Sequence, residues 1–382
     1  MKILYLVGFT DWWGNYPPDI LDRDDSGTVG GGEAAALYTA FWLGQNGHDV
    51  TYCSVATPGT YGGVKFAPLL DHMRTYYAEG PWDAVVAWAN MGLLRPIQPG
   101  AVRIFAQQLN DLVCATGWED FCDVIVSPSH THVKLMQGLT LQPDKVVNEV
   151  VYNGVDLRMY PWPPIAPKDR PMQVGWWSSP DRGLQHLLRA WPRIKARVPE
   201  AKLKVFYQIN KYIAAARGNP GRQGLMSHVL EMLLSQTRHL DVELVDAIPR
   251  KRLALEQAKT RVQAYPCDPA GFTEGFACSI VEAMAAGVLP VVRLVDSLPE
   301  LWGSTAVPLE GVPPSDAFLD EVADKVVWGL TEWAEDPGGA AGGPTMQQLR
   351  DHAERFTWDA AGLQMEGVIE RAIERTRVSK AA

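Results

Sequence analysis

The stretch Gly271–Pro290, GFTEGFACSIVEAMAAGVLP, carries two glutamates, Glu274 and Glu282, with seven residues between them. Within it, Ala277–Ala286 is expected to form a short helix, because Gly287 suits the position just beyond a helix end. The amino terminus of such a helix presents free N–H groups and about half a positive charge, so it can bind phosphate. Glu274 precedes this helix, and Glu282 lies roughly 7 Å further along its axis at 1.5 Å per residue.

This spacing fits a ligand that has hydroxyl groups at both ends and phosphate between them. A nucleoside diphosphate sugar has that layout, and Gly275 would let it approach the backbone closely. The same pattern also fits an acid at a helix entry followed by a solvated helix residue. The spacing alone leaves both interpretations open.

Composition indicates a globular protein with two domains. The chain has 382 residues, of which 47% are hydrophobic and 21% are charged. No apolar run approaches the roughly 20 residues that cross a bilayer, and the short apolar start predicts a buried strand rather than a signal peptide. The formal charge of −9 disfavours a wide nucleic-acid footprint. The five scattered cysteines predict reduced thiols and a cytoplasmic protein.

Strand-like and helix-like segments alternate in two series, which predicts an α/β protein with two doubly wound parallel sheets. The proline-rich segment Pro161–Pro171 separates the series as an extended connector, and Glu335–Pro344 is a glycine-rich loop. In such a fold, ligands bind beyond the carboxyl ends of strands, here in a cleft between the domains. The predicted strands are Lys2–Val7, Val50–Ser54, Ala84–Ala87, Arg103–Phe105, Val124–Ser127 and Val146–Tyr152, then Val174–Trp177, Leu203–Tyr207, Val242–Leu244, Val262–Ala264 and Pro290–Val292.

A second glycine cluster, Gly30–Gly32, precedes a predicted apolar helix over Gly32–Gln45. Such a loop can bring backbone N–H groups to a phosphate, although a tight turn into a helix is the commoner explanation of a glycine triplet. The G-x-G-x-x-G fingerprint of dinucleotide-binding proteins is absent.

Four segments together resemble the GT-B-fold retaining glycosyltransferases of the family 4-like group. They are GGGEAAALYTAFWLGQNGHDVTY (Gly30–Tyr52), VVYNGVD (Val150–Asp156), SSPDRGLQHLLRAWPRIKARVPEAKLKVFY (Ser178–Tyr207) and EGFACSIVEAMAAG (Glu274–Gly287). The resemblance implies two Rossmann-like domains that face a cleft, with the C-terminal helix crossing back to the first. Residues 1–160 would form the first domain, completed by 357–382, and residues 172–356 would form the nucleotide-sugar domain after a linker at 161–171.

The resemblance also implies roles for individual residues. Glu274 matches the acid that holds the donor sugar's hydroxyl groups, and Glu282 matches the acid that holds the ribose. Arg182 stands where the family usually has a lysine that neutralises the diphosphate. The other donor-side matches are Gly31, Gly32, Gly275, Phe276, Ala277 and Ile280.

The sequence departs from the family pattern in two places. The family arginine before the lysine position is missing, and Ser178 or Ser179 lies in that region. Lys211 is a candidate for a replacement cation, or else a solvated surface lysine. The family histidine is also missing, so Asn110 or Asp111 is expected to take its role, Asp111 as a catalytic residue.

His130 and His132 follow a predicted strand, and their spacing of two does not place them on one helix face, so metal binding is not expected. His130 is a candidate for acceptor contact, for helix capping or for plain surface placement.

The resemblance predicts transfer of a hexose from a UDP- or GDP-sugar to an acceptor hydroxyl, with no metal and no tightly bound cofactor. The alternatives are a nucleotide-sugar-binding module without transferase activity and a nucleotide-sugar epimerase; a phosphorylase would need a pyridoxal lysine, and we identify none. The acceptor stays open among polysaccharide, lipid, small molecule, protein and modified DNA base. No strong nucleic-acid or membrane signal narrows this choice.

Overall fold

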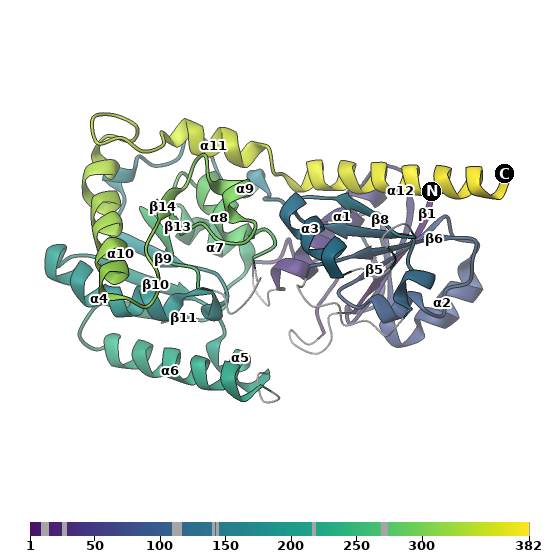
Figure 1. Cartoon of the computed structure of the whole chain (residues 1–382), viewed down its shortest axis with the longest axis horizontal. Coiled ribbons are helices and arrows are strands. Elements are labelled where there is room, and N and C mark those ends of the chain that lie inside the picture. Colours follow the sequence, from purple (N-terminus) through teal and green to yellow (C-terminus); the bar gives the residue numbers. More distant parts are fainter. Residues whose placement is uncertain are drawn as a thin grey trace. The chain divides into compact units, whose positions relative to one another are not determined.

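The computed structural model describes the chain in two compact units (Figure 1). The first consists mainly of residues 1–154 and 356–382, and the second mainly of residues 155–355. Within the described residues, no helix combines the length and apolar character needed to cross a membrane. The described residues are 1–8, 15–24, 29–108, 117–139, 142, 145–215, 219–268 and 274–381.

The first unit is built on a sheet of eight described strands in the order β3-β4-β2-β1-β5-β6-β7-β8. All neighbours are parallel except β3 and β4. The central strands β1 and β5 are buried along almost their whole length, which explains their continuous apolar sequences. The strands are β1 Lys2–Val7, β2 Asp49–Ser54, β3 Gly59–Tyr61, β4 Val64–Pro68, β5 Ala84–Trp88, β6 Val102–Ala106, β7 Val124–Ser127 and β8 Val147–Val150, and the helices are α1 Gly31–Gln45, α2 His72–Glu79, α3 His130–Leu139 and α12 Trp358–Ala381.

The β3–β4 hairpin turns at Gly62 and Gly63, which both have positive φ, 57° and 79°. Two positive φ angles define the type I′ turn that suits a tight hairpin. A Cβ on Gly63 would lie 2.8 Å from backbone atoms of Gly44 in α1, so glycine also permits the close packing of this turn on the helix. The sequence analysis did not predict either strand.

The C-terminal helix α12 belongs to the first unit and packs along α1 (Figure 1). The rings of Tyr38 and Trp358 stack with centroids 4.8 Å apart, and His48 lies 2.6 Å from Glu366. Gly154 lies against the start of this helix, where a Cβ would be 2.4 Å from the backbone carbon of Thr357. Aromatic stacking and close backbone packing therefore attach the last helix to the first unit.

The second unit is built on a parallel sheet of six described strands in the order β11-β10-β9-β12-β13-β14. The strand order reverses beside β9. From β9 the chain continues to β10 and β11 on one side, and it then crosses over to β12 on the other side. In sheets of this kind, ligands bind beyond the strand ends at the point of reversal. The strands are β9 Gln173–Trp176, β10 Lys202–Phe206, β11 Val242–Val245, β12 Val262–Tyr265, β13 Leu289–Arg293 and β14 Val307–Leu309, and the helices are α4 Leu184–Arg197, α5 Ile209–Ala215, α6 Pro220–Gln236, α7 Arg250–Gln257, α8 Cys278–Ala285, α9 Leu298–Trp302, α10 Asp316–Trp328 and α11 Met346–Glu354.

The proline-rich segment at 161–171 is packed into the second unit. Arg170 is buried, and its guanidinium donates hydrogen bonds to the carbonyls of Ile165, Thr260 and Ala286 at 2.8 to 3.0 Å. Arg170 therefore attaches this segment, which includes a 3₁₀ turn at Pro167–Asp169, to the residues that precede β12 and β13.

Gly154→Ala is expected to destabilise the protein by about 1–3 kcal/mol, because the new methyl group would overlap the backbone of Thr357 and Trp358. Chemical denaturation of the full chain measures this effect. Gly138→Ala is the matched control in the same unit, since no described atom lies within 4 Å of the position that its added methyl group would occupy. An equal loss in both variants would contradict the proposed packing of α12 at Gly154.

Candidate functional site

Helix α8 follows an unusual turn in the second unit. The residue before it, Ala277, has a left-handed backbone with φ of 61°. This conformation costs a residue with a Cβ about 1–2 kcal/mol, and such residues concentrate at functional sites. Trp302 stabilises the turn, because its indole N–H donates to the carbonyl of Phe276 at 2.9 Å. The surrounding structure therefore holds the start of α8 in a conformation that local preference disfavours.

Glu274 lies buried beyond the carboxyl end of β12. Its Oε1 forms an ion pair with Nε of Arg182 at 2.8 Å and accepts a hydrogen bond from the Tyr265 hydroxyl at 3.0 Å. Its backbone N–H donates to Oδ2 of Asp296 at 3.1 Å. Both side-chain contacts fall on one oxygen, which orients the carboxylate and leaves Oε2 as the atom for a ligand.

Arg182 reaches Glu274 from the loop that follows β9. Gly183, with φ of 110°, allows this loop to lie against the one after β12, because a Cβ there would be 2.2 Å from the carbonyl oxygen of Pro266. Asp181 lies in the same loop and accepts a hydrogen bond at 2.7 Å from the hydroxyl of Tyr212 in α5. This contact fixes the loop to α5. The strand-end loops thus converge on one acid–arginine pair.

Glu282 in α8 forms a second acid–arginine pair. Its Oε1 lies 3.3 Å from Nη1 of Arg250, and its Oε2 accepts from Nε2 of Gln257 at 3.1 Å. The side-chain oxygen of Gln257 in turn accepts from the Tyr160 hydroxyl at 2.7 Å. Three residues therefore fix the orientation of this carboxylate.

Burial dominates the protonation of both acids. It raises the pKa of Glu274 to about 7, although Arg182 and the Tyr265 hydrogen bond act in the opposite direction. It also raises the pKa of Glu282, against the lowering effect of Arg250 and Gln257. Burial disfavours the charge on Arg182, yet Glu274 and Asp181 raise its pKa above the ordinary value. Arg182 stays charged, while Glu274 changes charge close to neutral pH.

The glycine cluster lies at the start of α1 in the first unit. The buried Glu33 accepts from the N–H of Gly30 at 3.2 Å in a capping arrangement. No described atom lies within 4 Å of a Cβ placed on Gly31. Packing within the described residues therefore does not require glycine there, and the phosphate-binding role of Gly31 and Gly32 stays a prediction.

The remaining donor-side residues differ in what they can offer. Ile280 is fully buried and its N–H donates to the carbonyl of Ala277 at 3.0 Å, so in this structure it is a core residue of α8. The ring of Phe276 is buried against Trp302, with centroids 5.2 Å apart. Only backbone groups of this turn, including the half-buried Gly275, are placed to meet a ligand.

The acceptor-side predictions are less defined. Asn110 and Asp111 lie outside the described residues. His130 begins α3 on the surface of the first unit, with its ring 6.2 Å from that of Tyr152. Lys211, considered as a second cation, is an exposed residue of α5.

The sequence analysis missed Arg250, Gln257 and Tyr265. The first two stand seven residues apart at the two ends of α7, which places them on one helix face two turns apart. That spacing was visible in the sequence, but nothing in it indicated that this face meets α8. Tyr265 ends an apolar strand, where an aromatic residue is typical of the core.

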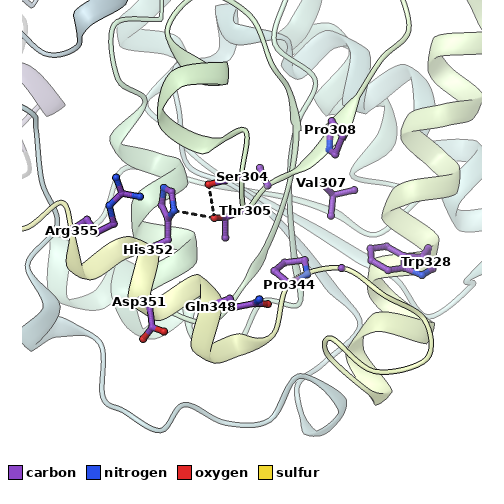
Figure 2. Close-up of a pocket in the computed structure, with 12 residues that line it drawn as sticks. Ser304, Thr305, Val307, Pro308, Trp328, Pro344, Gln348, Asp351, His352 and Arg355 are labelled. Atoms are coloured by element: carbon purple, nitrogen blue, oxygen red, sulfur yellow. Dashed lines mark hydrogen bonds between the residues drawn. The ribbon is translucent and has the colours of Figure 1, made fainter.

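A cavity of about 650 Å³ lies elsewhere in the second unit, beside β14 and α11 (Figure 2). Its central polar groups satisfy one another, since His352 contacts the Thr305 hydroxyl at 2.9 Å and the Leu301 carbonyl at 2.7 Å. The residues that line it do not include Glu274, Glu282, Arg182 or Arg250. We place the functional site at the acids, because the charged groups that can do chemistry gather there.

Several solved structures resemble the chain along nearly its whole length. Sucrose-phosphate synthase from Thermosynechococcus elongatus aligns with a TM-score of 0.67 at 15% identity, covering 98% of this chain and 100% of that one. The trehalose-6-phosphate synthase OtsA aligns with a TM-score of 0.66 at 13% identity, covering 97% and 99%. Anabaena HepE, solved in complex with UDP and glucose, aligns with a TM-score of 0.64 at 15% identity, covering 97% and 100%.

The chain has the GT-B fold. This confirms the predicted fold class of two α/β units with parallel sheets. No protein-family model matches the sequence, and the search of curated proteins gave no match. At such low identity the GT-B likeness establishes the fold, and the function is argued from the residues of the site.

A double-mutant cycle on Arg182 and Glu274 should reveal strong coupling. Arg182→Met leaves a buried carboxylate without its cation and is expected to cost about 3–5 kcal/mol in unfolding free energy. Adding Glu274→Gln should recover at least about 1 kcal/mol of that loss. Urea unfolding at about pH 8 is the measurement, because the carboxylate is then ionised.

Arg193→Met serves as the control for this cycle, because Arg193 pairs with the exposed Asp316 and should show little effect. Simple additivity of the Arg182 and Glu274 substitutions would show that the two side chains do not depend on each other.

Proposed function

We propose that the protein is a retaining glycosyltransferase that moves a hexose from a nucleotide diphosphate sugar to an acceptor hydroxyl. The observation that carries the proposal is a pair of carboxylates, the buried Glu274 before the start of α8 and the half-buried Glu282 within it, each in contact with an arginine. Carboxylates bind hydroxyl groups, whereas arginines and helix amino termini bind phosphate. A ligand with a sugar at each end of a diphosphate uses all of these groups.

In this proposal Glu274 binds the donor sugar through Oε2, because Oε1 already contacts Arg182 and Tyr265. Glu282 binds the ribose hydroxyls through the lone pairs that Arg250 and Gln257 leave available, since a carboxylate accepts about four hydrogen bonds. The backbone of Gly275 and Ala277 faces the phosphates.

Catalysis would be electrostatic. The bond between the sugar's anomeric carbon and the diphosphate oxygen breaks while a bond to the acceptor oxygen forms on the same face. The acceptor proton passes to the departing diphosphate. Arg182 and the α8 amino terminus stabilise the charge that develops on the leaving group. The described residues contain no cluster of three or more metal-binding side chains, and the proposed chemistry uses none.

Two alternatives share the same donor contacts. A binding module would hold the nucleotide sugar without releasing nucleoside diphosphate. An epimerase would convert the donor sugar in the absence of any acceptor. The binding module is motivated by the missing family arginine and histidine, whereas the epimerase keeps the fold and changes the reaction.

A panel of UDP- and GDP-sugars should identify one that stabilises the protein, by about 2.7 kcal/mol at one hundred times its dissociation constant. With that donor, Glu274→Ala is expected to lower turnover roughly 100-fold or more, because the reacting sugar loses its positioning carboxylate. Glu282→Ala should mainly weaken nucleotide binding, by roughly 10- to 100-fold. Release of nucleoside diphosphate across an acceptor panel is the readout.

Product analysis on the same reactions tests the finer claims. The product should keep the anomeric configuration of the donor, and chelation should leave turnover unchanged. Donor binding with no release in any acceptor mixture would favour the binding module. Conversion of the donor sugar without acceptor would favour the epimerase.

Binding of the sugar portion should depend on pH near neutrality. The carboxylate form of Glu274 accepts hydrogen bonds from hydroxyl groups, and burial raises its pKa to about 7. The ratio of affinities for the donor and for its nucleoside diphosphate should therefore rise between about pH 6 and pH 8. Isothermal titration measures both affinities, and Glu274→Gln should remove the trend. Persistence of the same trend in Glu274→Gln would assign it to another group.

A further inference from the structure

The charges at α8 do not balance if Arg182 is the only cation that meets the ligand. A bound diphosphate brings about two negative charges, and Glu274 and Glu282 bring two more. Against these, Arg182 supplies one positive charge and the helix amino terminus about half of one. Uncompensated charge in a partly buried site is costly, so a second cation close to the phosphates would lower that cost.

Arg250 occupies the position where such a cation is needed. It is the first residue of α7, which follows β11 and packs beside α8 in the second unit (Figure 1). Arg182, Glu274 and Arg250 therefore lie beyond the carboxyl ends of β9, β12 and β11, all on the same edge of one parallel sheet. This is the edge at which ligands bind in open α/β sheets.

The Arg250 guanidinium is held against Glu282, and the Arg250 side chain is partly exposed. Its Nη1 lies 3.3 Å from Glu282, and 17% of its side chain is exposed, against 12% for the acid. Glu282 cannot turn away, because Gln257 donates to its second oxygen at 3.1 Å and is itself fully buried. A cation fixed in this way needs little reorganisation to contact an anion.

The electrostatic influence of Arg250 extends to the amino terminus of α8. Burial raises the pKa of the Cys278 thiol to about 12; Glu282 raises it further, and Arg250 lowers it. Cys278 is the first residue of α8. Arg250 therefore acts on the same turn whose N–H groups are proposed to face phosphate.

We infer that Arg250 binds the phosphate next to the ribose of the donor nucleotide while it stays paired with Glu282. The inference rests on the proposed function, in which Glu282 binds that ribose. A purely structural Arg250 would only orient Glu282, and its loss would weaken binding of the nucleoside and of the nucleoside diphosphate equally. If Arg250 binds phosphate, its loss weakens binding of the nucleoside diphosphate more than binding of the nucleoside.

Isothermal titration of full-length wild type and Arg250→Gln with uridine, UDP, guanosine and GDP separates these cases. For the base that wild type prefers, Arg250→Gln should weaken nucleoside diphosphate binding by about 10- to 100-fold, the effect of losing one charge-assisted hydrogen bond. Nucleoside binding should change by less than about threefold, within the reach of a small reorientation of Glu282. Arg250→Lys keeps the charge and should recover part of the diphosphate affinity.

Arg252→Gln is the matched control, because it removes the same charge from an exposed position two residues along α7. It should leave both affinities unchanged. Should Arg250→Gln fold poorly, the double variant Arg250→Gln/Glu282→Gln removes both charges together. For each of these two variants, Arg250→Gln/Glu282→Gln and Glu282→Gln alone, the ratio of nucleoside diphosphate affinity to nucleoside affinity is measured. The comparison of the two ratios then tests the inference.

Equal losses for nucleoside and nucleoside diphosphate in Arg250→Gln would overturn the inference and leave the proposed function standing. An equal loss in Arg252→Gln would also overturn the inference, because the effect would then come from the net charge of the protein and not from a contact of Arg250. If wild type binds neither diphosphate, the proposed function and this inference fall together.

Discussion

The contact between Glu274 and Arg182 is the interaction on which the candidate site depends. It joins the loop after β12 to the loop after β9 across 2.8 Å, and Tyr265 adds a third point of attachment. Gly183 makes the contact possible by allowing the two loops to touch. Because both charges are largely buried, loss of Arg182 leaves the Glu274 carboxylate without this cation, and loss of Glu274 leaves Arg182 paired with Asp181 at 3.8 Å. The geometry of the loops and the charge state of the acid are therefore set together.

Arg250 and Glu282 form a second acid–arginine pair, which joins α7 to α8. Each acid has a guanidinium beside it. The left-handed Ala277 starts α8 in the sequence between Glu274 and Glu282. A short helix that is strained at its entry and flanked by matched charges is a costly arrangement, which favours a functional role over a packing role.

Sequence reasoning recovered most of the parallel strands because they are buried on both faces and form continuous apolar runs, such as β1 and β7. It missed the β3–β4 hairpin, although Gly62-Gly63 signalled a tight turn, and it missed the short edge strand β14 of the second sheet. At the site, the spacing of Glu274 and Glu282 left two interpretations open, and the family resemblance singled out the two acids. The arginine that meets Glu282 comes from α7, and only the packing of α7 on α8 reveals it. Such a partner depends on tertiary contact, which a single sequence does not record.

The paired charges also limit which ligands can bind. In the structure the carboxylates and guanidiniums satisfy one another, so the site is stable without a ligand, and a ligand must replace or supplement contacts that already exist. A free sugar offers hydroxyl groups but no anion for the arginines. Inorganic phosphate offers an anion but competes with carboxylates already in place. A molecule that carries both gains at the acids and at the arginines in the same event, because its hydroxyl groups and phosphates share one ordering cost. The internal pairing of the charges therefore supports the proposed preference for a nucleotide sugar over its separate parts.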